Sequence, residues 1–152
     1  MSLIVLLDAG PLGMITNPKS SPENEACKNW LELLVSRGVD VFIPEIADYK
    51  VRRGLLRAGK DRGLRRLDAL KGLLPYAPIT TAAMLRAAEF WAAARRMGRQ
   101  SADDSSLDAD MILAAQAVTL GANGNETMIA TTNVRHLESF AVAKIWRDVT
   151  SE

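Results

Sequence analysis

The chain has few of the residues that several common kinds of site require. Its 152 residues include one cysteine, Cys27, so an internal disulfide cannot form and a reducing cytoplasmic setting is expected. His136 is the one histidine, so a metal site cannot rest on imidazole ligands. This argues against zinc and leaves carboxylate and amide oxygens as the available metal ligands.

Motifs of nucleotide and hydrolytic sites are also missing. The chain contains no G-x-x-x-x-G-K-[ST] and no G-x-G-x-x-G, so nucleotide-cradling loops are unsupported. It has no G-x-S-x-G, and nothing marks His136 as a base, so a Ser-His-Asp triad is poorly supported. The aromatic residues are too scattered to form a platform for stacked bases.

Long hydrophobic runs are absent as well. No apolar run reaches the roughly 18 residues of a membrane-spanning helix. The apolar segment Leu3–Leu7 is short, lacks a basic region before it and is interrupted by Asp8, so we expect no signal peptide. An apolar content of 48% and a charged content of 24% are typical of globular proteins. We therefore expect a single domain over residues 1–152, cytoplasmic and not bound to a membrane.

The net charge is only +1, but basic residues gather between Lys50 and Lys71, where Asp61 and Asp68 are the only acids. A basic segment beside an acidic cluster suits an enzyme that cuts phosphodiesters, because one part holds the backbone and the other holds a metal. Solvated helix faces, or a surface for an acidic protein, explain the same charges. Charge alone leaves these alternatives open.

The hydrophobic pattern predicts strands and helices in alternation. Leu3–Leu7 is typical of a strand buried on both faces, and Asp8–Gly13 carries turn residues. Ser21 and Pro22 predict the start of a helix that continues to about residue 37. Further strands are predicted at 39–43, 75–79, 127–131 and 142–146, and further helices at 44–57, 61–73, 80–97 and 105–120, with a helical turn at 134–140. This alternation predicts a parallel sheet covered on both faces.

Two long helices are expected in the second half of the chain, separated by a polar loop at 98–104. Thr80 or Thr81 is the expected cap of the first, and Ser105 or Ser106 the expected cap of the second. The apolar residues of the first helix that we expect to face inward are Met84, Leu85, Ala88, Trp91 and Ala92.

Acidic or amide residues stand where predicted strands end or the following helices begin: Asp8, Glu45, Asp108, Asp110 and Asn133. Ligands bind at that edge of a parallel sheet. Carboxylates that meet there repel each other unless a divalent ion lies between them, and oxygen ligands favour Mg²⁺ or Mn²⁺. Helix capping, turn formation and helix-dipole interactions are the plain structural alternatives. Asp110 is a better candidate for a direct metal ligand than Asp108, because residues two apart on a helix point in different directions.

Four segments together resemble the PIN domain family, in particular the VapC-type ribonuclease toxins of prokaryotic toxin–antitoxin pairs. They are Leu6–Ala9, Ile43–Glu45, Asp108–Ala117 and Thr131–Leu137, which follow the family's order over nearly the whole chain. The most specific feature is the Asp-x-x-Leu-Ala-Ala start of a helix. The resemblance implies a three-layer α/β/α sandwich with a central parallel sheet of about five strands.

The resemblance also implies a metal-dependent endoribonuclease that leaves 5′-phosphate and 3′-hydroxyl ends. Its Mg²⁺ or Mn²⁺ ligands would be Asp8, Glu45 and Asp110, with Asn133 in the family's fourth acidic position and Asp108 as a further candidate. Asparagine at position 133 lowers the charge of a second metal site and favours a one-ion mechanism. The family's hydroxyl residue after the first Asp is not evident here, and Asn17 is a partial substitute.

Substrate and partners follow from the same resemblance. Candidate contacts to the RNA backbone are Arg52, Arg53 and Arg57. Arg52 shares a helix face with Glu45, so it could neutralise that carboxylate or touch a phosphate beside it. A homodimer is implied, together with an antitoxin that could place an arginine among the carboxylates and displace the metal.

Two other functions stay open. One is a catalytically inert PIN-like module that binds RNA or a protein, which Asn133 mildly favours. The other is a metal-dependent phosphatase on a doubly wound sheet. A phosphoaspartyl enzyme would have a second Asp two residues after Asp8, where this chain has Gly10, so the phosphatase is weakly supported.

Overall fold

The computed structural model describes residues 3–98 and 104–151, which form a parallel sheet with helices on both faces. The sheet has five strands in the order β3-β2-β1-β4-β5. Their bounds are β1 (Leu3–Leu7), β2 (Asp40–Pro44), β3 (Tyr76–Ala77), β4 (Glu126–Thr131) and β5 (Ala143–Ile145). The predicted three-layer α/β/α class is confirmed.

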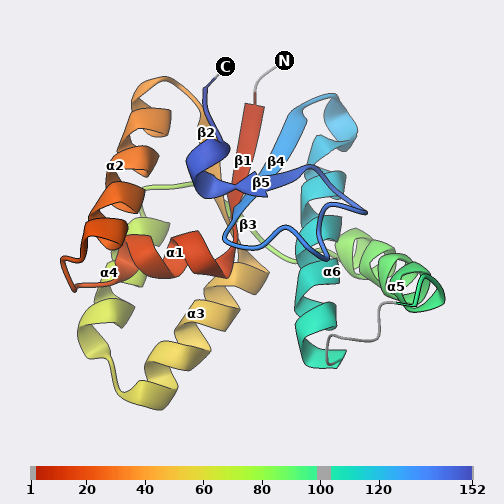
Figure 1. The fold of residues 1–152 in the computed structure, drawn as a ribbon, viewed down its shortest axis with the longest axis horizontal. Helices are drawn as coiled ribbons and strands as arrows, with labels where there is room; N and C mark the ends of the chain where they lie inside the picture. Colours follow the sequence, from red (N-terminus) through yellow and green to blue (C-terminus); the bar gives the residue numbers. More distant parts are fainter. Residues whose placement is uncertain (1–2, 99–103, 152) are drawn as a thin grey trace.

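The helices form the two outer layers. They are α1 (Ala9–Thr16), α2 (Pro22–Ser36), α3 (Glu45–Ala58), α4 (Asp61–Lys71), α5 (Thr81–Arg96) and α6 (Asp104–Leu120), with short 3₁₀ turns η1 (Gly121–Asn123) and η2 (Trp146–Asp148). In Figure 1, α1, α2 and α4 lie to the left of the strands, and α5 and α6 lie to their right. Within the described ranges, none of these helices combines the length and hydrophobicity needed to cross a membrane.

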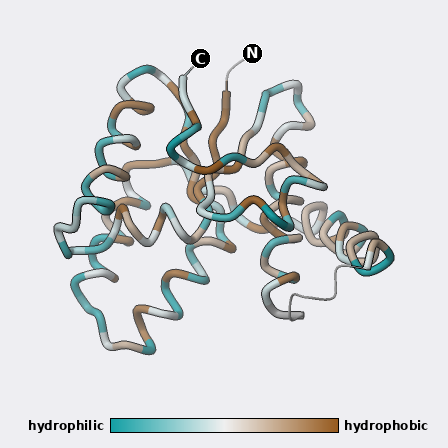
Figure 2. Tube along the Cα trace, in the orientation of Figure 1, coloured by the Kyte–Doolittle hydropathy of each residue, from teal (hydrophilic) through white to brown (hydrophobic). Residues whose placement is uncertain are grey.

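Strand β1 lies at the centre of the sheet and supplies both cores. Its register places Val5 opposite Val41 of β2 and Met128 of β4. Figure 2 shows β1 as a continuous hydrophobic stretch. Because successive side chains of a strand point to opposite faces, Val5 and Leu7 pack in the core with α1, α2 and α4, whereas Ile4 and Leu6 pack with α6. Because all pairings in the sheet are parallel, the carboxyl ends of the strands lie at one edge.

Helix α1 is absent from the sequence-based prediction, which assigned Asp8–Gly13 to a turn. Asp8 caps this helix, since its side chain accepts from the Ala9 N–H. Pro11 lies in the first turn, where a backbone N–H would have no partner within the helix, so proline is tolerated there. A Cβ on Gly10 would lie 2.7 Å from the Thr132 side chain, so the glycine lets the start of α1 approach the end of β4.

Three of the five α5 residues that were predicted to face inward are exposed. Met84 and Leu85 are 47% and 66% exposed, and Ala88 is exposed as well. The buried residues of this helix are alanines, Ala83, Ala87 and Ala94, which pack with α6. Small side chains allow the two helix backbones to approach closely, so Met84 and Leu85 are left on the outer side, whereas Trp91 is partly buried against this cluster. Thr80 does cap α5, accepting from the Ala83 N–H at 3.1 Å.

The start of α6 also differs from the expectation. The helix begins at Asp104, so Ser105 and Ser106 lie in its first turn and not at its cap. Most of the polar loop predicted at 98–104 lies outside the described residues. The remaining predicted strands and helices are observed within a few residues of the expected bounds.

Candidate functional site

Asp8 is held at the carboxyl edge of the sheet by two elements. Its Oδ1 accepts the Ala9 N–H at 2.7 Å, and its Oδ2 accepts the Thr131 hydroxyl at 2.7 Å. Its backbone N–H donates to the Ala130 carbonyl at 3.0 Å. Since Ala9 begins α1 while Ala130 and Thr131 end β4, the position of this carboxylate is fixed by the fold.

Asp110 lies close enough to Asp8 for the two carboxylates to influence each other. It is half-buried on α6, and its pKa is raised, first by burial and then by the negative charge of Asp8. Lys50 of α3 and His136 act in the opposite direction and lower the pKa of Asp110. The structure thus brings together two acids that are 102 positions apart in the sequence, and places a lysine and a histidine near enough to influence Asp110.

This pair fits a divalent cation. Both donors are carboxylates, which are the ligands that Mg²⁺ and Mn²⁺ prefer. The pKa of Asp110 is raised first by burial and then by the charge of Asp8, so its ionised form is unfavourable, and a bound cation would favour that form. Asp8 and Asp110 are therefore the residues that would hold such an ion.

Glu45 begins α3 as expected, but its side chain is already engaged. Its Oε1 accepts the Ile79 backbone N–H at 2.7 Å, which ties α3 to the segment between β3 and α5. Within residues 3–98 and 104–151, no three acidic, histidine or cysteine side chains lie close enough to hold one ion together. In this arrangement Glu45 supports the edge of the site, and its role as a metal ligand stays a prediction.

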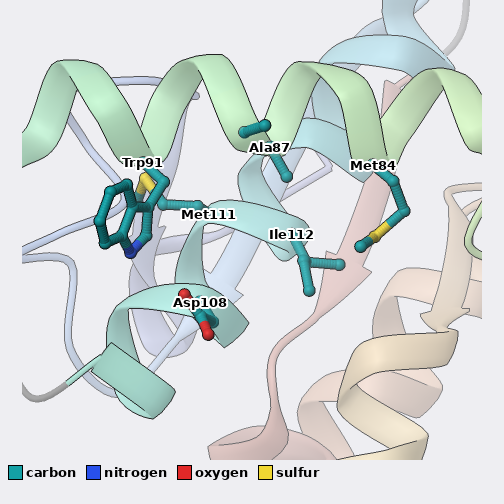
Figure 3. A pocket seen from close by; sticks show the side chains of 7 residues that line it. Met84, Ala87, Trp91, Asp108, Met111 and Ile112 are labelled. Carbon is teal, nitrogen blue, oxygen red and sulfur yellow. The ribbon is translucent and has the colours of Figure 1, made fainter.

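Asp108 lines a surface groove to which Asp110 does not contribute. It is exposed and lines a groove of about 270 Å³ between α5 and α6, together with Met84, Ala87, Ala88, Trp91, Met111 and Ile112. Figure 3 shows Asp108 below the apolar side chains of this groove. The expectation that residues 108 and 110 point in different directions agrees with this placement.

Asn133 belongs to the turn that follows β4. Its side-chain Oδ1 accepts the Arg135 N–H at 3.1 Å, and its own N–H donates to the Thr131 hydroxyl at 3.1 Å. These bonds form the turn that a structural role for asparagine predicts. Metal binding by Asn133 stays a prediction.

The three arginines proposed to contact substrate lie in different settings on α3. Arg52 binds Asp48 and Asp68, with N–O distances of 3.0 and 2.7 Å. Of the two alternatives for Arg52, neutralising Glu45 or touching a phosphate beside it, the first is not observed, because the guanidinium pairs with these other acids. Arg53 stacks on Tyr49 at 5.1 Å from the ring centre, and Arg57 is exposed. The guanidiniums of Arg53 and Arg57 remain candidates for RNA contacts.

Arg52 is part of a network around one buried carboxylate. Asp48 is 5% exposed, and its oxygens accept from Arg52, from Lys71 at 3.0 Å and from the Tyr76 hydroxyl at 2.9 Å. Burial alone would raise the pKa of Asp48, but the hydrogen bonds from Lys71 and Tyr76, together with the charge of Arg52, hold it below its usual value. The network joins α3, α4 and β3.

Three residues of the site are not found by the sequence analysis: Thr131, Lys50 and His136. Thr131 could have been found, since it ends a strand at the same edge as Asp8. Lys50 and His136 reach Asp110 only through the tertiary fold, so no local pattern reveals them. Asn17, the suggested substitute for a hydroxyl residue, lies at the far end of α1 from Asp8, and the hydroxyl that binds Asp8 comes from Thr131.

Comparisons with known proteins agree with this architecture. The profile of the PIN domain family matches residues 5–140. A search of curated proteins finds no match. Among solved structures, VapBC2 from Rickettsia felis, bound to a DNA fragment from its promoter, is 16% identical with a TM-score of 0.74, covering 94% of this chain and 98% of that one.

Two further structures show the same fold. DNA-bound VapBC from Salmonella typhimurium is 19% identical with a TM-score of 0.67, covering 95% of this chain and 98% of that one. VapC20 from Mycobacterium tuberculosis, described as a toxin that cleaves the sarcin-ricin loop, is 11% identical with a TM-score of 0.59, covering 91% and 96%. Since the family profile spans most of the sequence and these structures share its architecture, the chain belongs to the PIN domain family and folds like the VapC proteins.

Proposed function

We propose that this protein is an endoribonuclease that hydrolyses RNA phosphodiester bonds with Mg²⁺ or Mn²⁺, as the toxin of a toxin–antitoxin pair. The observation that carries the proposal is the electrostatic coupling of Asp110 to Asp8, which lies at the carboxyl edge of a PIN-domain sheet. A similar structure is named as a toxin that cleaves the sarcin-ricin loop.

A divalent ion bound by this pair would supply a nucleophile near neutral pH and offset negative charge that develops on the phosphate. The residues of the chain prepare the site for that ion. The Ala9 N–H and the Thr131 hydroxyl fix both oxygens of Asp8, so little reorganisation is needed on binding. Lys50 lies beside Asp110 and favours its ionised form, which is the form that binds a cation.

The test is cleavage of structured RNA by the purified protein in Mn²⁺, in Mg²⁺ or in EDTA, with a DNA of the same sequence as a comparison. We expect RNA cleavage that requires the ion and is absent from the Asp8→Asn variant. Cleavage that persists in EDTA, or in the Asp8→Asn variant, would contradict the proposal. Cleavage of DNA in place of RNA would correct the substrate class.

Thr131 offers a sharper prediction, because its hydroxyl holds Asp8 and its side chain is buried. We expect Thr131→Val to lower Mn²⁺ affinity and RNA cleavage by roughly 10–100-fold, as for other groups that orient a metal ligand. Titration calorimetry and initial rates measure the two effects. Thr131→Ser keeps the hydroxyl and should retain most of both, whereas equal loss in the valine and serine variants would point to packing and not to the hydrogen bond.

The catalytically inert binding module is the second candidate. It is favoured by the engagement of Glu45 with the Ile79 N–H and of Asn133 with the Arg135 N–H. If this candidate is correct, the protein will bind RNA but will not cleave any RNA tested, with Mn²⁺ present or absent. RNA cleavage that depends on Asp8 excludes it.

An antitoxin partner is part of the proposal, because two of the similar structures are VapBC assemblies. A groove of about 580 Å³ beside α2 and α4 has apolar walls suited to a helix or strand of such a partner. Its apolar members are Ile15, Leu31, Val35, Leu70, Leu73 and Leu74.

An arginine of the partner among Asp8, Glu45 and Asp110 would exclude the metal by charge. Co-expression with a cognate antitoxin should give a complex with reduced nuclease activity, and unchanged activity in that complex would contradict this route.

A homodimer is also proposed. Tyr49 and Leu56 of α3 are 56% and 61% exposed, which leaves apolar surface on this helix for a contact between two copies. Sedimentation of the purified protein tests this, and a monomer at all concentrations would exclude it.

A further inference from the structure

A basic hollow lies where the segment after α1 meets the turn between α3 and α4. It has a volume of about 630 Å³ and is lined by Asn17, Pro18, Lys19, Gly59, Lys60, Asp61, Arg62, Gly63 and Arg65. Two hydrogen bonds fix the position of the first segment, since the Asn17 carbonyl accepts from Lys28 at 3.1 Å and from Arg66 of α4 at 3.5 Å. We call this site the basic hollow.

The charges of the basic hollow are strongly one-sided. It contains four cationic side chains, Lys19, Lys60, Arg62 and Arg65, and one acidic side chain, Asp61. In the described part of the chain, none of these four cations forms an ion pair, whereas Arg52 and Lys71 of the same basic segment bind Asp48. The basic segment therefore divides into a part that stabilises the fold and a part whose charge faces solvent.

The backbone keeps the basic hollow open. Gly59 ends α3 with a φ of 67°, a left-handed conformation in which other residues are strained. Neither Gly59 nor Gly63 brings a side chain into the hollow, and Pro18 is its only apolar side chain. A polyanion can therefore approach both the backbone and the surrounding cations. A protein partner would lack apolar side chains to pack against here, unlike in the groove beside α2 and α4.

The basic hollow lies on the far side of two helices that start at the acidic edge. Asp8 caps α1, whose last residue Thr16 precedes the hollow, and α3 runs from Glu45 to the turn at Gly59. Eight residues of α1 span about 12 Å at a rise of about 1.5 Å per residue. An RNA with a phosphate at the Asp8–Asp110 pair can therefore reach the hollow a few nucleotides away.

We propose that the basic hollow binds the sugar–phosphate backbone of the RNA substrate, a few nucleotides from the scissile bond. This inference rests on the proposed ribonuclease function and extends it with a second contact region. Its residues differ from the arginines of α3 that the sequence suggested, and it adds Lys19 from a separate part of the chain. The hollow would strengthen binding without reading the base sequence, because phosphate contacts carry no sequence information.

The test measures RNA binding separately from catalysis. Fluorescence anisotropy with a labelled single-stranded RNA of about 20 nucleotides is recorded for the Asp8→Asn protein, which leaves the probe intact. Two triple variants are made in this Asp8→Asn protein. The hollow variant carries Lys60→Glu, Arg62→Glu and Arg65→Glu. The matched control carries Arg37→Glu, Arg96→Glu and Lys144→Glu. The control changes net charge equally at exposed sites elsewhere. Circular dichroism verifies that both variants are folded.

We expect the hollow variant to lose at least about tenfold in RNA affinity and the control to lose much less. The slope of log affinity against log salt should fall by about 2, since each phosphate contact on a single strand contributes roughly 0.7. Equal losses in the two variants would overturn the proposal. Unchanged RNA binding, with loss of binding to poly-glutamate instead, would overturn it in favour of an acidic protein partner.

A small substrate separates this inference from the proposed function. Bis(p-nitrophenyl) phosphate is too short to reach the hollow from the Asp8–Asp110 pair. Its metal-dependent hydrolysis is measured in proteins that keep Asp8, with and without the three substitutions of the hollow variant. The two rates should be the same. RNA binding that depends on the hollow in a protein that cleaves nothing would support the inference and contradict the nuclease. Metal-dependent cleavage together with an RNA affinity that is unchanged in the hollow variant would support the nuclease and contradict the inference.

Discussion

Replacing Asp110 with asparagine is expected to stabilise the ion-free protein while abolishing RNA cleavage. Burial and the charge of Asp8 raise the pKa of Asp110 in the native state, so the native protein holds this proton more tightly than the unfolded chain. The stabilisation from this group is complete at acidic pH and is lost as pH rises through the raised pKa. At neutral pH the ionised carboxylate therefore destabilises the fold, and a neutral amide removes that cost.

The expected gain in melting temperature is about 2–4 °C, the shift that ~1 kcal/mol produces in a domain of this size. The parent should recover stability when Mn²⁺ is added, by about 2.7 kcal/mol at an ion concentration of roughly 100 times the dissociation constant. Asp110→Asn should lose that response. Loss of a direct ligand should reduce cleavage by more than the roughly 10–100-fold cost of losing a supporting group.

Thermal unfolding from about pH 4 to pH 8, with Mn²⁺ or EDTA, measures the effects on stability and on the Mn²⁺ response, and initial rates of RNA cleavage measure the loss of activity. Asp108→Asn is the matched comparison, because it makes the same change on the same helix but in the groove beside α5. It should leave both the melting temperature and the Mn²⁺ response nearly unchanged. A fall in melting temperature for Asp110→Asn, or an intact Mn²⁺ response, would remove Asp110 from the proposed metal site.

Removing the Asp48 carboxylate is expected to produce the largest loss of stability. In Asp48→Ala, the charges of Arg52 and Lys71 would face each other without their shared acid, and the Tyr76 hydroxyl would lose its acceptor. Breaking a buried ion pair costs roughly 3–5 kcal/mol, and the partial exposure of both cations places the expected loss near ~3 kcal/mol. That corresponds to a fall of roughly 6–12 °C in melting temperature.

The pH dependence of this loss has the opposite sign to that of Asp110. The pKa of Asp48 is held below its usual value, so its stabilisation is present above the unfolded pKa and is lost as pH falls through the folded one. The difference in melting temperature between parent and Asp48→Ala should therefore shrink in acid. Tyr76→Phe removes one hydrogen bond alone and should cost only about 1 kcal/mol. Equal losses in the two variants would mean that the network is not organised around Asp48.

The sequence predicted the sheet well because buried parallel strands such as Leu3–Leu7 are continuous apolar runs with clear turn residues after them. Helix α1 was not predicted because glycine and proline, here Gly10 and Pro11, are frequent in turns. The need for glycine at position 10 comes from the close approach of Thr132, which only the tertiary structure reveals. The face of α5 was misassigned because large apolar residues were expected to be buried, whereas close packing with α6 selects alanine.

For the candidate site, the position of Asp8 and Asp110 followed from where strands end and helices begin. The neighbours of Asp110 did not, because Lys50 and His136 come from segments distant in the sequence. Arg52 illustrates a different limit. Helical spacing correctly placed Glu45 on the same side of α3, but a competing acid one turn away, Asp48, and Asp68 of α4 determine where its guanidinium lies.

The central place of β1 has a consequence for the time at which the site can exist during synthesis. The hydrogen bond that holds Asp8 comes from Thr131, 123 residues later in the chain. At a synthesis rate of about 5–20 residues per second, roughly 6–25 s separate the two residues on the ribosome. Until β4 is made and pairs with β1, the Asp8 carboxylate of the nascent chain lacks its hydrogen bond from Thr131. For the proposed ribonuclease, this order of synthesis leaves the site incomplete until β4 has been made.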